Sequence, residues 1–356
     1  MSEILSVLEG YEFFSPIDTV EKMAGGNVNA SYKITSAEGD RYVLQKINTS
    51  VFPCVPALME NVEKVTEKLR KMKEEKSLDK MRVLNIKFTK EGRSFLERGG
   101  VFYRVYDFVK NSAPVSSADD ALTVYRTGKA FGIFDALMNE GELPALNVVI
   151  KDFHNTPLRI ENLERSYKKA PESRKNKAKR VAEYIFSKGS EIRGIYLKTE
   201  ACPNRIVHND TKCNNVIFDR ESGEALGVFD LDTVMYGRIS DDFGDGVRSI
   251  AGPAREDEKD LSSVFLNMEN FKAFAEGFLS ETAPVVTDGE RGVLAGSVFA
   301  LPLELSARFL TDYLDGNTYF RVDYPEQNLD RAKCQAALAR DAQKRLPEIK
   351  KWLKTQ

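Results

Sequence analysis

The sequence predicts an α+β protein, with an antiparallel sheet in the first third of the chain and mainly helices in the rest. Up to about residue 109, short runs alternate apolar and polar side chains, as strands do. Beyond that point, apolar residues recur at helical spacing. The turn-rich segment 111–120 (NSAPVSSADD) separates the two patterns, so we expect domains at 1–110 and 111–356.

Five runs of the first third have the alternation of strands. They are residues 31–35 (SYKIT), 41–48 (RYVLQKIN), 82–90 (RVLNIKFTK), 93–98 (RSFLER) and 101–109 (VFYRVYDFV). One helix is expected between the second and third runs, because apolar residues there are spaced by four, three and four positions. These residues are Leu58, Val62, Val65 and Leu69.

The remainder of the chain is predicted to be mostly helical. The first helix contains Leu122 and Met138, with Asp119 or Asp120 as its N-cap. The basic stretch 159–198 is interpreted as solvated helix surface, because aromatic residues do not alternate with its charges as they would in a nucleic-acid site. The last stretch, 328–354, is predicted as a surface helix.

Composition excludes several classes of protein. The 356 residues include 52 Lys and Arg against 54 Asp and Glu, a net charge of -2, which gives no overall attraction to nucleic acid or to an anionic membrane. The four cysteines lie far apart, without the spacing of a zinc site. The first ten residues carry acids where a signal peptide has bases. We therefore expect a cytoplasmic protein that binds neither nucleic acid nor membranes, with its oligomeric state left open.

The residues with chemical potential are concentrated in 206–232 (IVHNDTKCNNVIFDRESGEALGVFDLD). Asp210 follows His208 by two positions and Asn215 follows Asp210 by five, which is the H-x-D-x-x-x-x-N spacing of the protein-kinase catalytic loop. Asp230 ends the next strand pair. Phosphoryl transfer needs a carboxylate near the attacking hydroxyl and oxygen ligands for Mg²⁺, so Asp210 is the candidate base and Asn215 and Asp230 are the candidate metal ligands.

Lys212 is a second candidate catalytic residue, since its charge can stabilise the transferred phosphate. Other nucleotide-binding motifs are absent from the sequence. RTGKAFG lacks the first glycine and the hydroxyl residue of a Walker motif, and GDGVRS is not a complete G-x-G-x-x-G. The ordered set of histidine, aspartate, asparagine, hairpin and D-x-D therefore remains as the signal for function.

With these residues, the chain resembles the aminoglycoside phosphotransferase and choline kinase superfamily of small-molecule kinases. The phrases that resemble the N-acetylhexosamine 1-kinases within it are HNDTKCNN, FDLDTVMYG, LQKINTSVF, RVYDFV and RFLTDYLDGNTYF. The resemblance implies a two-lobed protein-kinase-like fold that uses ATP and Mg²⁺.

The resemblance also assigns nucleotide contacts in the first lobe. Residues 105–109 (VYDFV) correspond to the hinge, where the Asp107 carbonyl and the Val109 amide meet adenine. The lysine that pairs with the phosphates in this fold falls at Gln45 or Lys46, which the sequence leaves open. Glu60, on the predicted helix, is the candidate partner of that position.

For the acceptor, the resemblance implies contacts from Arg308 and Tyr319, together with Asp210 and Asp230. Asn27 is a further candidate substrate contact, at a position where these sugar kinases often have a histidine. His154 is interpreted as a loop histidine with its hydrogen bonds satisfied rather than as a ligand.

These observations lead to one expected function and two alternatives. The expected function is ATP-dependent phosphorylation of the anomeric hydroxyl of N-acetylglucosamine or N-acetylgalactosamine. One alternative is a kinase of the same fold that acts on an aminoglycoside, choline or homoserine. The other is a nucleotide-binding module without catalysis.

Overall fold

The computed structural model describes residues 2–13, 15–23, 28–115, 120–252 and 254–356. These residues form two compact units. The first unit contains residues 1–112 and the short segment 144–150, and the second contains residues 113–143 and 151–356. The return of 144–150 to the first unit was not visible as a boundary in the sequence.

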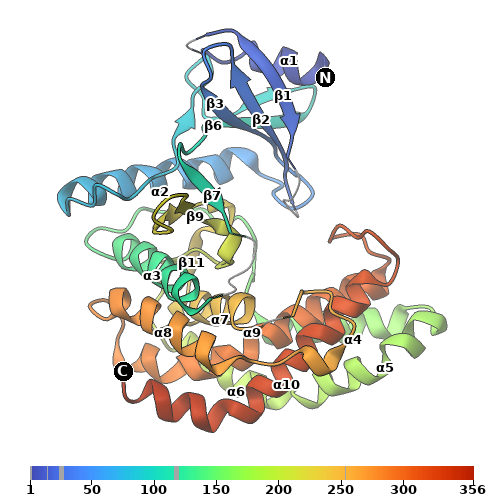
Figure 1. Ribbon diagram of the computed structural model, residues 1–356. Coiled ribbons are helices and arrows are strands. Elements are labelled where there is room, and N and C mark those ends of the chain that lie inside the picture. The colour runs from blue at the N-terminus through green and yellow to red at the C-terminus, as the bar shows by residue number, and fades with distance from the viewer. Residues whose placement is uncertain (1, 14, 24–27, 116–119, 253) are drawn as a thin grey trace. The chain divides into compact units, whose positions relative to one another are not determined.

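The first unit is built on a six-stranded antiparallel sheet (Figure 1). Its strands are β1 (Ile17–Lys22), β2 (Ala30–Ser36), β3 (Arg41–Lys46), β4 (Ile86–Lys87), β5 (Leu96–Arg98) and β6 (Val101–Asp107). The order is β1-β2-β3-β6-β4, and β5 also pairs with β6. All five predicted runs therefore contain a strand, but the run 82–90 is strand only at Ile86–Lys87. Before it, the Arg70 side chain binds the Leu84 carbonyl at 3.1 Å, in place of a strand partner.

Two helices accompany this sheet, α1 (Ser2–Leu8) and α2 (Val55–Glu75). The predicted interruption of the sheet is α2, and its four predicted apolar residues are almost completely buried. The α1 helix packs on side chains such as Leu44 and Tyr103, which point to one face of the sheet. Their neighbours Gln45 and Arg104 point to the other face, because strand side chains alternate, and there Arg104 contacts Met59 of α2.

The second unit is mainly helical, as predicted. Its helices are α3 (Ala121–Met138), α4 (Thr156–Lys169), α5 (Glu172–Ser187), α6 (Gly189–Glu200), α7 (Ile239–Ile250), α8 (Met268–Thr282), α9 (Asp288–Asp315) and α10 (Gln327–Leu353). Of the two cap candidates, Asp120 caps α3 by accepting a hydrogen bond from the Thr123 amide at 2.8 Å. Asp119 lies outside the described residues.

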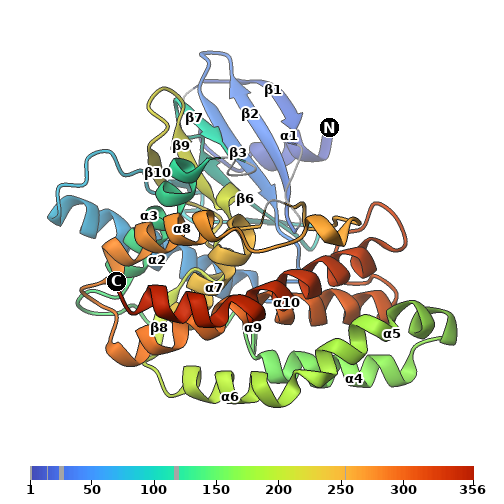
Figure 2. The ribbon, with the colours of Figure 1, turned by 60° about the horizontal axis from the view of Figure 1, so that its bottom comes forward.

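The α9 helix is the centre of this unit and packs against α4, α7 and α10 (Figure 2). By length and composition α9 could cross a membrane, but 78% of its most apolar window is buried in the protein, as in a core helix. The α10 helix is less of a surface helix than predicted. Its small residues Ala332, Ala336 and Ala339 form a buried stripe, because their spacing of four and three places them on one face.

Short strands carry the residues of interest. They are β7 (Ser112–Pro114), β8 (Arg205–Val207), β9 (Val216–Asp219), β10 (Ala225–Val228) and β11 (Met235–Gly237). The order β10-β9-β7 forms one sheet, and β11 pairs with β8 in another. Three-residue 3₁₀ turns follow at Cys213–Asn215, Leu231–Thr233 and Leu261–Ser263. The loop between β8 and β9 contains the H-x-D-x-x-x-x-N part of the predicted motif, and Asp230 follows β10.

Candidate active site

The catalytic loop, residues 208–215, is held by two aspartates of α7. Asp242 accepts hydrogen bonds from the amides of His208 and Asn209, both at 2.6 Å. Asp245 accepts one from the Thr211 amide at 2.9 Å. Asn209 has a positive φ of 65°, a conformation that an asparagine tolerates and that these amide bonds fix. These three hydrogen bonds hold the backbone of the loop in this conformation.

Asp245 is ionised as well as buried. Burial opposes its charge, but Arg248, Lys212 and His154 together lower the pKa of Asp245 to about 2. The Arg248 Nε atom lies 2.8 Å from its Oδ1 atom. The sequence analysis missed Asp242 and Asp245. The feature that could have indicated them is the spacing of three between these two acids in DDFGD, which places them on one face of a helix.

His208 supports the loop from the protein interior. Its Nε2 atom is 2.9 Å from the Phe229 carbonyl, and its Nδ1 atom is 3.3 Å from the Asp210 amide. A carbonyl only accepts and an amide only donates, so the proton is on Nε2 and Nδ1 is the acceptor. The rings of Phe131 and Phe134 pack edge-on against the imidazole at 5.3 and 5.4 Å. His208 is thus a buried spacer between the loop and the end of β10.

Asp210 is the partly exposed carboxylate of this loop. Its Oδ1 atom is 2.7 Å from the Lys212 ammonium, and its Oδ2 atom accepts a hydrogen bond from the Asn215 side chain at 2.9 Å. Burial acts against the charge of Lys212, but Asp210, with Glu256 and Asp245, raises the pKa of Lys212 above its usual value. Lys212 is therefore charged at neutral pH, and its contact together with that of Asn215 fixes the orientation of the Asp210 side chain.

The two candidate metal ligands are brought together by the β9–β10 hairpin. Val216 pairs with Val228, and the Phe229 amide donates to the Asn215 carbonyl at 2.8 Å, so Asp230 follows directly beside Asn215. Asp230 is exposed and has a left-handed backbone, with φ of 59°. The Asn215 side-chain nitrogen faces Asp210, which leaves its oxygen on the other side. An amide oxygen and a carboxylate are hard ligands that suit Mg²⁺.

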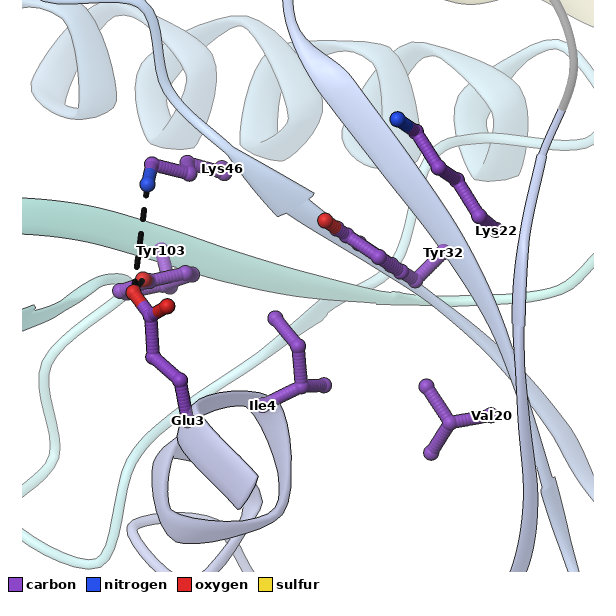
Figure 3. A pocket seen from close by; sticks show the side chains of 7 residues that line it. All are labelled: Glu3, Ile4, Val20, Lys22, Tyr32, Lys46 and Tyr103. Carbon is purple, nitrogen blue, oxygen red and sulfur yellow. Dashed lines mark hydrogen bonds and ion pairs between the residues drawn. The ribbon is translucent and has the colours of Figure 1, made fainter. Parts of the chain in front are cut away.

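In the first unit, Gln45 and Lys46 are on opposite faces of the sheet. Gln45 faces α2, and its Oε1 atom accepts hydrogen bonds from Arg104 at 3.0 and 2.8 Å. The ammonium of Lys46 lies 3.9 Å from Glu3 of α1. Figure 3 shows this pair at the edge of a pocket of about 180 Å³ on the α1 face. The position that faces α2 is therefore a glutamine, and the cation beside it is Arg104, which the sequence analysis missed.

Glu60 does not meet the predicted partner. Its carboxylate binds Lys64 at 2.6 Å and the Asn147 side chain at 2.9 Å, and neither Gln45 nor Lys46 is among its contacts in the described part of the chain. The reason is helical geometry, because Met59 occupies the face of α2 toward Arg104 and the next residue points about 100° away. In this structure Glu60 therefore pairs with Lys64 and Asn147 rather than with residue 45 or 46.

The predicted hinge lies at the end of β6. The Asp107 amide donates to the Asn85 carbonyl at 3.0 Å, and the Ser112 hydroxyl donates to the Val109 carbonyl at 2.6 Å. Within the described part of the chain, the Val109 amide makes no hydrogen bond. Hydrogen bonds thus hold the Asp107 amide and the Val109 carbonyl, while the Val109 amide remains available for the predicted contact with adenine.

Arg308 and Tyr319 lie together in the second unit. The Arg308 guanidinium carbon lies over the rings of Phe153, at 4.9 Å, and Phe320, at 5.7 Å, and among the described residues the side chain makes no hydrogen bond or ion pair. Tyr319 packs edge-on against Phe320 at 4.8 Å. Asn27, the remaining candidate contact, lies outside the described residues.

Asp312 holds this arrangement, one helical turn after Arg308 on α9. Its carboxylate accepts hydrogen bonds from the amides of Tyr319 and Phe320 at 2.8 and 2.9 Å. Gly316, with φ of 105°, and Asn317, with φ of 60°, turn the chain back over the helix. Asp312 therefore positions Tyr319 and the Phe320 ring that lies beside the Arg308 guanidinium.

Solved structures of other proteins share the fold of this chain. Among solved structures, an aminoglycoside phosphotransferase from Alicyclobacillus acidocaldarius is similar, with a TM-score of 0.66 and 14% identity over 99% of this chain and 96% of that one. A microcompartment-associated aminopropanol kinase has a TM-score of 0.62 and 15% identity, over 98% of each chain.

A third similar structure is the amicoumacin kinase hAmiN in complex with AMP-PNP, Ca²⁺ and Ami. Its TM-score is 0.57 and its identity 14%, over 99% of this chain and 92% of that one. These similarities show the fold, which is the predicted protein-kinase-like one. The family model of the phosphotransferase enzyme family, APH, matches residues 19–262. That match covers more than half of the chain and includes the catalytic loop, so the protein belongs to the APH phosphotransferase family of kinase-like enzymes.

Proposed function

We propose that this enzyme transfers the γ-phosphate of ATP to the anomeric hydroxyl of an N-acetylhexosamine, with Mg²⁺ as the metal. The observation that carries the choice of acceptor is Arg308, whose guanidinium lies over two aromatic rings without a polar partner in the described structure. Arg308 and Tyr319 offer donors to the hydroxyl and acetamido oxygens of a neutral sugar. A cationic acceptor would call for carboxylates at this position.

In the proposed reaction, Asp210 orients the acceptor hydroxyl and accepts its proton as the oxygen bonds to the γ-phosphorus and ADP leaves. The contacts of Asp210 with Lys212 and Asn215 support this role, because they hold the carboxylate in one orientation. An anomeric hydroxyl is more acidic than an ordinary alcohol, so it asks less of Asp210 as a base.

Asn215 and Asp230 are proposed to hold Mg²⁺, which when bound neutralises charge on the nucleotide phosphates. The oxygen chemistry of the two side chains and their adjacency across the β9–β10 hairpin support this assignment. For the nucleotide base, we propose contacts from the backbone of Asp107 and Val109. Of the two candidates for the position of the phosphate-pairing lysine, we propose Gln45, because its side chain lies beside Arg104 on the side of the sheet that faces α2.

A substrate panel tests the proposal. The purified protein is given ATP and Mg²⁺ with N-acetylglucosamine, N-acetylgalactosamine, choline, aminopropanol, homoserine or kanamycin, and ADP formation is measured. We expect turnover with the N-acetylhexosamines and a product that is non-reducing and acid-labile, because a phosphate on carbon one blocks ring opening. A reducing sugar phosphate, or turnover with amines alone, would reject the sugar assignment and leave the kinase assignment intact. No acceptor-dependent turnover at all would favour a non-catalytic nucleotide-binding module.

A further inference from the structure

A buried ion pair joins the loop before α4 to the middle of α9. The Nδ1 atom of His154 lies 3.0 Å from one carboxylate oxygen of Glu304, and the Thr156 hydroxyl donates to the other at 2.7 Å. The side chains of His154 and Glu304 are only 9% and 2% exposed. Glu304 therefore has a partner on each oxygen, and the imidazole has a fixed orientation.

The second nitrogen of His154 has no such partner. The Nε2 atom is buried and makes no hydrogen bond with any residue that the structure describes. Burial opposes the charge of the ring, but Glu304, with Asp241 and Asp245 of α7, raises the pKa of His154 to about 9. The imidazole is therefore protonated at neutral pH, and Nε2 carries a hydrogen. A buried donor without an acceptor is costly, which indicates that a ligand supplies the acceptor.

The neighbours of His154 are the residues that hold Arg308. The rings of His154 and Phe153 are 4.6 Å apart, and Phe153 is also the ring on which the Arg308 guanidinium stacks. Glu304 precedes Arg308 by one helical turn on α9. Arg159 lies nearby, where its guanidinium donates to the Phe153 carbonyl at 2.9 Å and its Nε atom is buried with no partner among the described residues. Three side chains that carry N–H donors, those of His154, Arg308 and Arg159, thus contact Phe153.

We propose that His154 and Arg308 form an acceptor subsite made of hydrogen-bond donors, in which the Nε2–H of His154 binds a carbonyl or hydroxyl oxygen of the acceptor. The same subsite rejects acceptors that carry an ammonium group there. This inference rests on the proposed function, since it names the residue that reads the acceptor and the class of acceptor that is excluded.

Charge explains the rejection. His154 and Arg308 are both cations, and a third, Arg159, is close to them. The charge of Glu304 balances that of His154, but both Glu304 oxygens are already bonded, to His154 and Thr156, so neither is available to an ammonium group of the ligand. Burial raises the pKa of Asp241 to about 7, so this neighbouring carboxyl carries only part of a charge at neutral pH. An ammonium placed here would meet like charges, whereas a carbonyl oxygen would meet donors.

Two variants of His154 separate recognition from structural support. In His154→Asn, the side-chain nitrogen can take the place of Nδ1 and keep the bond to Glu304, but nothing replaces Nε2. In His154→Gln, the side-chain nitrogen can reach the place of Nε2, but the bond to Glu304 is lost. If His154 binds the acceptor through Nε2, His154→Asn is the more impaired variant. If His154 only supports the fold through its bond to Glu304, His154→Gln is the more impaired variant.

The measurement is steady-state kinetics with N-acetylglucosamine, at saturating ATP, alongside the melting temperature of each variant. We expect His154→Asn to raise the KM for the sugar roughly 10- to 100-fold with a much smaller change in kcat, as for loss of a hydrogen bond from a charged donor. His154→Gln should raise KM less. A near-normal His154→Asn beside an impaired His154→Gln would overturn the inference, as would equal losses of kcat and melting temperature in both.

A binding measurement distinguishes failure of this inference from failure of the proposed function. The chain has only two histidines, so their imidazole NMR signals are assigned by comparison with His154→Asn. Addition of N-acetylglucosamine should shift the His154 signal, and choline should not. If the wild type phosphorylates a neutral acceptor other than an N-acetylhexosamine and His154→Asn raises its KM, the sugar assignment fails and the subsite stands. Preferred turnover of an ammonium acceptor, or no shift of His154 with any neutral acceptor, would overturn the subsite.

Discussion

Gln45 of β3 accepts two hydrogen bonds from the guanidinium of Arg104, its cross-strand neighbour on β6. Arg104 is 1% exposed and is one of the largest fully buried side chains among the described residues. Another strand thus supplies the cation on the α2 face of this sheet, where a kinase of this fold has its β3 lysine. Lys46, the neighbouring lysine in the sequence, points to the opposite face.

The substitution Gln45→Leu removes the acceptor for two donors of a buried guanidinium. We expect it to lower the free energy of unfolding by about 2 kcal/mol, since hydrogen bonds to charged groups contribute roughly 1.5–3 kcal/mol. The matched control is Lys46→Ala, which breaks a 3.9 Å ion pair of a 42% exposed side chain and should cost at most about 1 kcal/mol. Urea unfolding measures both. Equal losses in the two variants would contradict the different roles of the two faces.

Asp210→Asn keeps the size of the side chain and an oxygen that can accept from Lys212, but it removes the base. We expect kcat to fall by roughly 10²–10⁴, with the KM for ATP little changed. The melting temperature should stay close to that of the wild type, because the side chain is 25% exposed and sits on a loop held by Asp242 and Asp245. Turnover near the wild-type level would remove Asp210 from its proposed role.

The metal assignment predicts different effects of two alanine variants. Asp230→Ala should abolish activity at any Mg²⁺ concentration, because it removes the charged ligand. Asn215→Ala should raise the Mg²⁺ concentration needed for half-maximal activity, because it removes a neutral oxygen ligand. A Mg²⁺ titration of ADP formation measures both. If neither variant changes the metal requirement, the metal is held elsewhere.

The His154–Glu304 pair predicts that stability depends on pH. The pKa of His154 is raised from 6.5 to about 9, so the native state binds this proton more tightly than the unfolded state does. The contribution is fully present below pH 6.5 and is lost as the pH rises through 9, with an upper limit of about 3 kcal/mol. Asp241, whose pKa is raised to about 7, also contributes: its ionisation lowers the stability of the fold as the pH rises from about 4 to about 7.

Urea unfolding of the wild type and of His154→Asn at about pH 6.5 and about pH 9.5 isolates the histidine. We expect the wild type to lose stability between these values and the variant to lose clearly less, because an asparagine side chain does not titrate. Equal losses in the two proteins would show that His154 is not the group responsible.

The order of strands and helices was readable from the sequence because periodicity reports which side chains face a core. The α2 helix illustrates this, since its residues at steps of four, three and four are buried as predicted. The run 82–90 shows the limit. Its alternation is as clear as that of its neighbours, but Arg70, from another element, satisfies the Leu84 carbonyl and only two residues are strand.

The sequence by itself determined the catalytic loop. His208, Asp210, Lys212 and Asn215 lie within eight residues, so their spacing alone brings them together, and the hairpin that follows returns Asp230 to Asn215. Contacts of this kind are local in the chain, and a short loop has few ways to arrange them.

Only the tertiary structure decided which groups hold and complete the site. Asp242 reaches the loop from 34 positions away, and Glu304 meets His154 across 150. For the choice between Gln45 and Lys46, the sheet fixed which of two adjacent residues faces α2, and it placed Arg104 beside the first. No local pattern encodes such pairs, because the partner of a buried polar group is set by how distant elements pack around it.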